Sequence, residues 1–183
     1  MGFEVPLVYR TPKPLSRAWI QRNIGTMKHI HIRAVGSPTE SWQTEAISMY
    51  LNRLKPFAKV DLIEVAEGHQ GSAKPDATKT RSREAESLAK GQPKGSFVIA
   101  LDETGTNFDS PTLARKFETW SESGQSLVFL IGGSWGLDPA LRSQANAVIS
   151  FGKQTLPHQV ARIVLLEQLY RAETIIRKKE YHK

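Results

Sequence analysis

The sequence contains no cysteine among its 183 residues. That absence excludes disulfide bonds, zinc sites made of thiolates and enzymes with a cysteine nucleophile. No apolar run approaches the ~20 residues that a membrane-spanning helix requires, which argues against an integral membrane protein. Neither GxGxxG nor the GK[ST] of a phosphate-binding loop occurs, so the chain is predicted to be neither a Rossmann nor a P-loop protein.

The composition that remains is ordinary for one soluble domain, but with an excess of positive charge. Hydrophobic residues make up 39% and charged residues 23%, with a net charge of +7. From residue 151 onward, seven basic residues oppose three acidic ones. This excess favours an anionic partner such as nucleic acid or a membrane surface, although solvated surface charge explains most such runs.

Residues 1–26 differ from the rest of the chain. They contain three prolines, four basic residues and one acidic residue, and Met27 stands directly before the first clear strand. We interpret them as a flexible N-terminal extension: an overlong start, a tag or a transit sequence, the last disfavoured because Ser16 is their only serine. The domain is expected to span 27–183, in the cytoplasm or, if 1–26 is a transit peptide, in a plastid or mitochondrion.

From Met27 onward the sequence alternates between strand and helix patterns. The short runs SFVIAL and SLVFLI are dense in aliphatic residues, which is typical of parallel strands that helices cover on both faces. The predicted strands are 28–35, 58–65, 96–101, 126–131 and 148–151. The predicted helices are 39–55, 78–89, 110–121, a short one after Asp138-Pro139, and 157–178. This alternation predicts an α/β fold, a mostly parallel sheet flanked by helices.

Three predicted strands end in segments that suit a ligand. Leu101-Asp102 and Ile131-Gly132-Gly133 would meet at the carboxyl edge of the sheet, where ligands of open α/β folds bind. The third segment, Phe151-Gly152-Lys153-Gln154-Thr155-Leu156, leads into a helix at Pro157, whose first N–H groups are free. Each piece alone is equally compatible with a tight turn, and Asp102 either accepts a ribose hydroxyl or starts that turn.

The last predicted helix carries the remaining candidates. His158 in its first turn is a possible base, phosphate ligand or polar cap. Arg162 and Arg171 are candidates for phosphate contact, while the apolar stripe suits a core or a dimer interface. Tyr181-His182-Lys183 offers an aromatic platform beside two donors, as unpaired RNA bases require, though a frayed terminus is the usual explanation. His29 and His31 lack further ligands, so no metal site is expected.

Taken together, these motifs resemble the RlmH (YbeA-type) family of SPOUT methyltransferases. The resemblance covers 27–183 and rests on Ala34-Val35-Gly36, Leu101-Asp102, Ile131-Gly132-Gly133, Thr155-Leu156-Pro157-His158, Arg162, Glu167, Tyr170-Arg171-Ala172 and Tyr181-His182-Lys183. It implies an alpha/beta-knot fold with a deep C-terminal trefoil knot, and methylation of N3 of a pseudouridine in large-subunit ribosomal RNA. Ser134-Trp135 stands in a variable part of the glycine loop.

The resemblance also implies the ligands and partners. S-adenosylmethionine would be held by the main chain of Leu101, Gly132, Gly133 and residues 151–156. The RNA, within the ribosome, would contact Arg171, Tyr181, His182 and Lys183, at a site shared across a homodimer. His158, Arg162 and His182 are the candidates for assisting proton removal from N3, with no choice among them. The alternatives are a SPOUT enzyme for another ribosomal or transfer RNA nucleotide, and a non-catalytic ribosome-binding factor.

Overall fold

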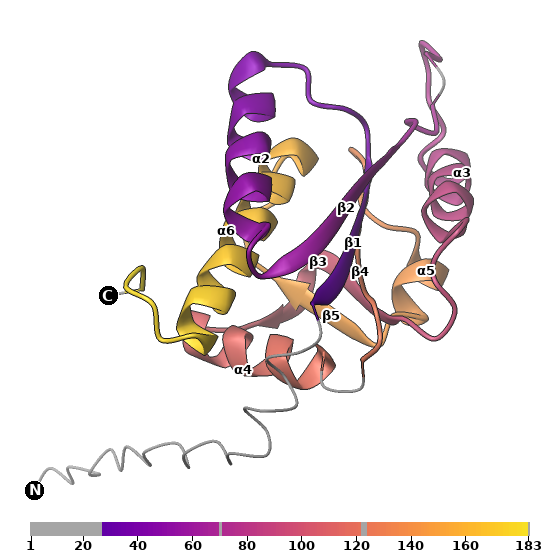
Figure 1. Ribbon diagram of the computed structural model, residues 1–183. Helices are drawn as coiled ribbons and strands as arrows, with labels where there is room; N and C mark the ends of the chain where they lie inside the picture. Colours follow the sequence, from indigo (N-terminus) through magenta and orange to yellow (C-terminus); the bar gives the residue numbers. More distant parts are fainter. Residues whose placement is uncertain (1–26, 70, 122–123, 183) are drawn as a thin grey trace, which may run out of the picture.

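The computed structural model describes residues 27–69, 71–121 and 124–182. The predicted extension 1–26 and Lys183 therefore lie outside the described residues. Five strands form one parallel sheet in the order β2-β1-β4-β3-β5 (Figure 1). The strands are β1 (Lys28–Val35), β2 (Ala58–Val65), β3 (Phe97–Asn107), β4 (Leu127–Ile131) and β5 (Ala147–Ser150). The helices are α2 (Ser41–Leu54), α3 (Ala77–Ala89), α4 (Ser110–Ser121), α5 (Pro139–Ser143) and α6 (His158–Ile176).

Helices cover both faces of the sheet, which confirms the predicted sandwich. Alternate residues of β4 face opposite sides: Phe129 joins the core under α2, α4 and α6, whereas Val128 packs with Leu88 of α3 and with Leu137. All five residues of β4 are buried. The two-sided burial is why this strand appears in the sequence as a continuous aliphatic run. None of the described helices is both long and apolar enough to cross a membrane.

Strand β3 is longer than the sequence pattern predicted. The expected strand stopped at Leu101, but the chain stays extended to Asn107, with a register shift against β5 between Leu101 and Thr106. Gly105 makes this continuation possible, because a Cβ there would stand 2.6 Å from the carbonyl carbon of Ile149. The close backbone approach places the second half of β3 directly against β5. The trefoil knot implied by the resemblance is compatible with this packing and stays a prediction.

Helix α6 ends earlier than predicted, at Ile176. Lys178 takes a left-handed conformation with φ 53°, its N–H donates to the carbonyl of Ile175, and that of Lys179 donates to Thr174 at 2.8 Å. These bonds form a Schellman-type cap, which reverses the chain. The segment that follows returns along α6 and brings Tyr181 back beside Glu167.

Candidate functional site

The three predicted ligand segments meet at one edge of the sheet. Leu101 pairs in register with Ile131, the last residue of β4, and with Ile149 of β5. It therefore lies level with the ends of both neighbouring strands, while β3 itself continues to Asn107. The hydroxyl of Thr155 donates to the Glu103 carboxylate, which ties the segment after β5 to the second half of β3. The structure therefore brings Leu101, Gly132 and residues 151–156 together, as the sequence suggested.

The segment after β4 is a tight turn whose glycines are required by close contacts. A Cβ on Gly132 would lie 2.5 Å from the carbonyl carbon of Gly136. The N–H of Gly136 donates to the carbonyl of Gly133 at 3.0 Å, and Gly136 has a φ of 72°. Trp135 projects from the tip of this turn and is 46% exposed. Ser134, Trp135 and Gly136 of the turn are exposed at the edge of the sheet, whereas Gly132 is buried.

The segment after β5 also presents its main chain. Ser150 closes its start, because its hydroxyl accepts the N–H of Gly152 at 3.1 Å and donates to the carbonyl of the same residue. Gly152 has a φ of 143°, which few other residues adopt. Residues 153–157 are all exposed, immediately before the first turn of α6. Free N–H groups of that turn are suited to polar or anionic ligand groups.

Asp102 is held within the protein. Its Oδ1 accepts hydrogen bonds from the backbone and hydroxyl of Thr104, and its Oδ2 accepts one from Arg142 at 3.0 Å. Burial acts to raise the pKa of Asp102, but these hydrogen bonds outweigh burial and lower the pKa. Asp102 thus bonds Thr104 of its own strand and Arg142 of α5, and the predicted turn is absent there because β3 continues to Asn107.

His158 and Arg162 lie together on the first turns of α6, beside the carboxyl ends of β1 and β2. The Arg162 guanidinium is fully buried and donates to Glu64 at 2.8 Å and to the carbonyls of Val35 and Gly36. His158 is half-buried and accepts at Nε2 from the Gln159 amide, 3.1 Å away. Desolvation lowers the pKa of His158, against an opposing effect of Glu67. Arg162 therefore fastens α6 to the sheet and is not accessible to RNA in the protomer, whereas His158 is kept neutral.

The C-terminal tail is docked rather than frayed. The Tyr181 hydroxyl donates to Glu167 at 3.1 Å, and its ring packs edge-on against Tyr170 at 4.7 Å between centroids. The Arg171 guanidinium pairs with Glu167 at 2.5 Å and lies 4.8 Å from the Tyr181 ring centre. Desolvation raises the pKa of Tyr181 to about 12, with Tyr50 and Glu167 adding to the rise. The tail is thus fixed on its own α6.

His182, next in the tail, stands at the rim of a cavity of about 500 Å³. Its ring lies 3.4 Å from Arg171 and is exposed. The cavity is also lined by Phe151 and Ser150 of the third segment, by Asn107 at the end of β3, and by residues of α4 and α6. The structure thus separates the candidate catalytic residues: His182 adjoins the predicted cofactor segment, whereas His158 and Arg162 adjoin the ends of β1 and β2.

Glu84 was missed by the sequence analysis. Its side chain is 3% exposed, and its Oε1 accepts the N–H of Gly68 at 3.0 Å. Burial raises its pKa, although the N–H groups of Gly68 and Gly133 counteract this rise. The buried stripe of α3, which places Thr80, Glu84 and Leu88 four residues apart, is the signal that was available. Glu84 thereby joins α3 to both the loop after β2 and the glycine turn.

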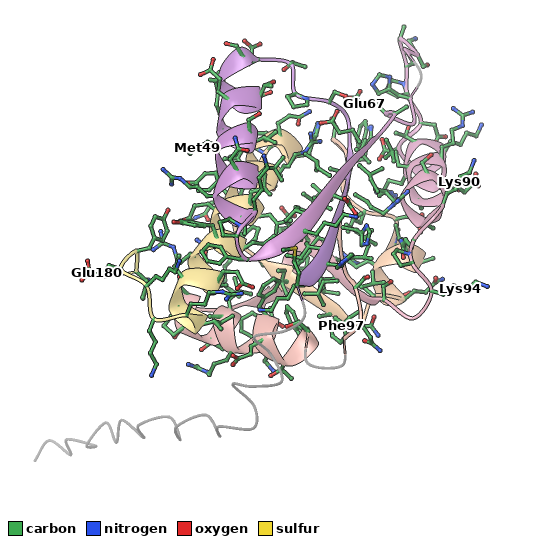
Figure 2. The ribbon with its side chains drawn as sticks, viewed as in Figure 1. Met49, Glu67, Lys90, Lys94, Phe97 and Glu180 are labelled. Carbon is green, nitrogen blue, oxygen red and sulfur yellow. The ribbon has the colours of Figure 1, made fainter. Side chains whose placement is uncertain are left out.

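In the part of the chain that the structure describes, no group of three or more histidine and carboxylate side chains is placed to hold a metal ion. His31 instead faces Asp61 at 3.5 Å, and His69 pairs with Glu67. Glu67 lies where β2 ends, as Figure 2 shows. Each of these histidines thus meets a single carboxylate.

Comparison with known proteins places the chain in a class and then in a family. Residues 27–182 match the family described as "Predicted SPOUT methyltransferase". The protein belongs to this family of SPOUT methyltransferases. Its relatives include three proteins named "Ribosomal RNA large subunit methyltransferase H". That of Bifidobacterium animalis subsp. lactis is 42% identical over 85% of this chain and 99% of the relative. The protein of Gemmatimonas aurantiaca is 40% identical over 84% of this chain and 99% of the relative. The protein of Desulforamulus reducens is 41% identical over 86% of this chain and 100% of the relative.

Proposed function

We propose that this protein transfers a methyl group from S-adenosylmethionine to large-subunit ribosomal RNA. The observation that carries the proposal is the meeting of three main-chain segments at one sheet edge in a chain of the SPOUT methyltransferase family. The name shared by relatives about 40% identical over their whole length supports ribosomal RNA as the substrate. The match begins at residue 27, which supports treating 1–26 as a separate extension.

The segments fit the cofactor. Gly132 and Gly133 let the backbone of the turn pack closely where a Cβ would collide with Gly136 and Glu84, and residues 153–156 after β5 are exposed. We assign the cofactor to Leu101, Gly132, Gly133, Phe151, Gly152, Lys153, Gln154, Thr155 and Leu156. S-adenosylmethionine supplies an electrophilic methyl group, so the protein mainly needs to align the acceptor and assist loss of its proton.

For the acceptor we propose N3 of a pseudouridine, with His182 as the side chain nearest the reacting atoms. An imide N–H is a weak acid, and a cationic or hydrogen-bonding group beside its anion favours proton loss. His182 is exposed at the cavity rim and is supported by Arg171, whereas Arg162 is buried and occupied. Arg171 and Tyr181 hold the tail in place, and we propose that they contact the RNA together with Lys183, which lies outside the described residues. His158 is neutral and half-buried beside Gly36 at the end of β1, and we give it no direct part in proton removal.

We further infer that the functional unit is a homodimer acting on the ribosome. The tail places the exposed ring of His182 at the open side of the cavity. The ring is therefore available to RNA bound by its own subunit or by a second one. Because the proposed substrate is the ribosome, we expect the reaction in the cytoplasm, or in an organelle if residues 1–26 act as a transit sequence.

The test is methyl incorporation from labelled S-adenosylmethionine into intact ribosomes and into naked RNA. Mass spectrometry of ribosomal RNA from a deletion strain should show loss of one methylpseudouridine. His182→Ala should abolish methyl transfer while calorimetric titration still shows cofactor binding. Absence of cofactor binding by the wild type would favour a ribosome-binding factor, and methylation of a different nucleotide would favour another SPOUT substrate.

A further inference from the structure

Five cationic residues lie at the ends of α2 and α6, and two of their side chains contact the buried ring of Phe57. The Arg177 guanidinium lies 5.1 Å and the Lys179 ammonium 4.8 Å from the centre of that ring. Arg53 lies 5.7 Å from the ring of Tyr170, which itself packs 6.1 Å from Phe57. We call this group the Phe57 surface; its cations are Arg53, Lys55, Arg177, Lys178 and Lys179.

These cations are exposed and mostly lack internal partners. Arg177 pairs with Glu173 at 3.2 Å, but among the described residues no carboxylate forms an ion pair with Arg53, Lys55, Lys178 or Lys179. Cation–π contact orders three of them, Arg53, Arg177 and Lys179, without neutralising their charge. The Phe57 surface therefore presents a concentrated positive charge held in a fixed arrangement.

The backbone of Lys178 gives independent support. It is the one described non-glycine residue with a positive φ, 53°, at the position of a Schellman cap that glycine ordinarily occupies. A left-handed conformation is unfavourable for a lysine because its Cβ crowds the following carbonyl. Strain of this kind persists where a side chain serves a function that glycine cannot supply. Here the side chain adds only an exposed charge.

We propose that the Phe57 surface binds the phosphate backbone of the ribosomal RNA substrate, outside the site of methyl transfer. This inference rests on the proposed function. Exposed lysine and arginine without internal partners attract phosphates and set the register of a nucleic acid. The surface adjoins the tail, which leads from Lys179 to His182 at the cavity. A second copy of the chain is disfavoured as the occupant, since a two-fold contact there would bring like charges together.

The test compares two double variants with equal loss of charge. Lys55→Ala/Lys178→Gly removes two charges from the Phe57 surface and relieves the strained backbone. Lys90→Ala/Lys94→Ala removes two exposed charges from the opposite side of the molecule, as the labels of Lys90, Lys94 and Glu180 in Figure 2 show. Binding to purified large ribosomal subunits is measured at several salt concentrations, with cofactor affinity measured alongside.

We expect the first variant to bind about tenfold more weakly near 0.1 M salt and its salt slope to fall by roughly one to two. The control should stay within about twofold of wild type. Lys178→Gly alone should raise Tm by about a few degrees while weakening binding, a combination that lost folding cannot produce. Cofactor affinity should be unchanged in all variants.

The proposal that the Phe57 surface binds phosphate would be overturned if the salt slope of Lys55→Ala/Lys178→Gly were unchanged. It would also be overturned if binding by the control variant weakened equally. Weaker binding at an unchanged slope would overturn it too, because the contact would then not be to phosphate. These outcomes are separate from the proposed function, which fails only if the wild type does not methylate ribosomal RNA.

Discussion

Two arginines on α6 show how burial divides residues that the sequence presents as equivalent. Arg162 is fully buried and donates to a carboxylate and two main-chain carbonyls. Arg171, further along the helix, is partly exposed and shared between Glu167, Tyr181 and His182. The first arginine fixes the helix to the sheet, and the second organises the tail. Only the second can contact a ligand without unfolding.

Replacing Arg162 should therefore cost stability rather than a single catalytic step. Arg162→Met leaves the carbonyls of Val35 and Gly36 and the Glu64 carboxylate without their donor, so we expect the free energy of unfolding to fall by about 3 kcal/mol. Urea denaturation measures this loss. Arg171→Met, which exposes nothing buried, should change stability by less than about 1 kcal/mol and serves as the matched control. Equal losses in the two variants would contradict the distinction.

Tyr181 provides a direct reading of tail docking. Because burial raises its pKa to about 12 from an ordinary 10.0, the docked neutral phenol stabilises the fold below pH 10 and this contribution is lost as pH rises towards 12. Titration followed by tyrosinate absorbance should show a late step near pH 12 from Tyr181 in the wild type. The late step should disappear in Tyr181→Phe and move to lower pH in Glu167→Gln. Titration of all tyrosines near 10 would show that the tail is undocked.

At the scale of elements, the sequence pattern was sufficient to predict the strands and helices but not where β3 and α6 end. The aliphatic runs of β3 and β4 predicted buried strands because helices cover both their faces. The extension of β3 past Leu101 depends on the contact of Gly105 with Ile149, which is distant in sequence. The end of α6 depends on a lysine in a glycine conformation, so no residue type marked it.

The candidate site was predicted to a similar degree. The three main-chain segments were identifiable because glycines follow buried strands, and their meeting follows from parallel topology. The separation of His158 from His182 was not identifiable, because it depends on how the tail returns along α6. Glu84 was overlooked because an acidic residue in a charged helix ordinarily faces solvent.

Helix α3 is predicted to hold the glycine turn through Glu84. Glu84→Ala leaves the buried N–H of Gly68 unpaired and should lower the free energy of unfolding by about 1–3 kcal/mol. We also expect weaker S-adenosylmethionine binding, because the carboxylate faces Gly133 of the proposed cofactor turn. Calorimetric titration and urea denaturation measure the two effects. Glu86→Ala, an exposed position on the same helix, is the control.

The pH dependence of a Glu84→Gln variant gives a second check. Burial raises the pKa of Glu84, so its contribution to stability is complete below the ordinary value of 4.5 and lost as pH rises through the raised pKa. Glutamine keeps an acceptor for Gly68 and has no charge to bury. The stability of the glutamine variant relative to wild type should therefore increase from about pH 4 to pH 7. A constant difference would show that Glu84 titrates normally.

At the scale of the whole molecule, the surfaces differ in the chemical groups that they present. Leu101 and the segments after β4 and β5 form the proposed cofactor site, and the tail brings His182 to the cavity that Ser150 and Phe151 line. The ends of α2 and α6 gather positive charge. The outer face of α2 instead presents two large apolar side chains, Trp42 at 52% and Met49 at 40% exposure, seven residues apart on one stripe. Tryptophan and methionine are enriched in the centres of protein interfaces.

We predict that this stripe of α2 lies in the interface of the proposed homodimer. Sedimentation of the wild type should give a mass of twice 20.5 kDa, and Trp42→Glu/Met49→Glu should reduce it to one chain, since charge buried in an apolar interface is costly. Trp135→Glu removes an equally exposed tryptophan from the glycine turn and should leave the dimer intact. If methylation is lost with the dimer while cofactor binding persists, the RNA site requires both subunits. If the wild type sediments as one chain, the proposed homodimer is wrong. If the dimer persists in Trp42→Glu/Met49→Glu, its interface does not include this stripe of α2.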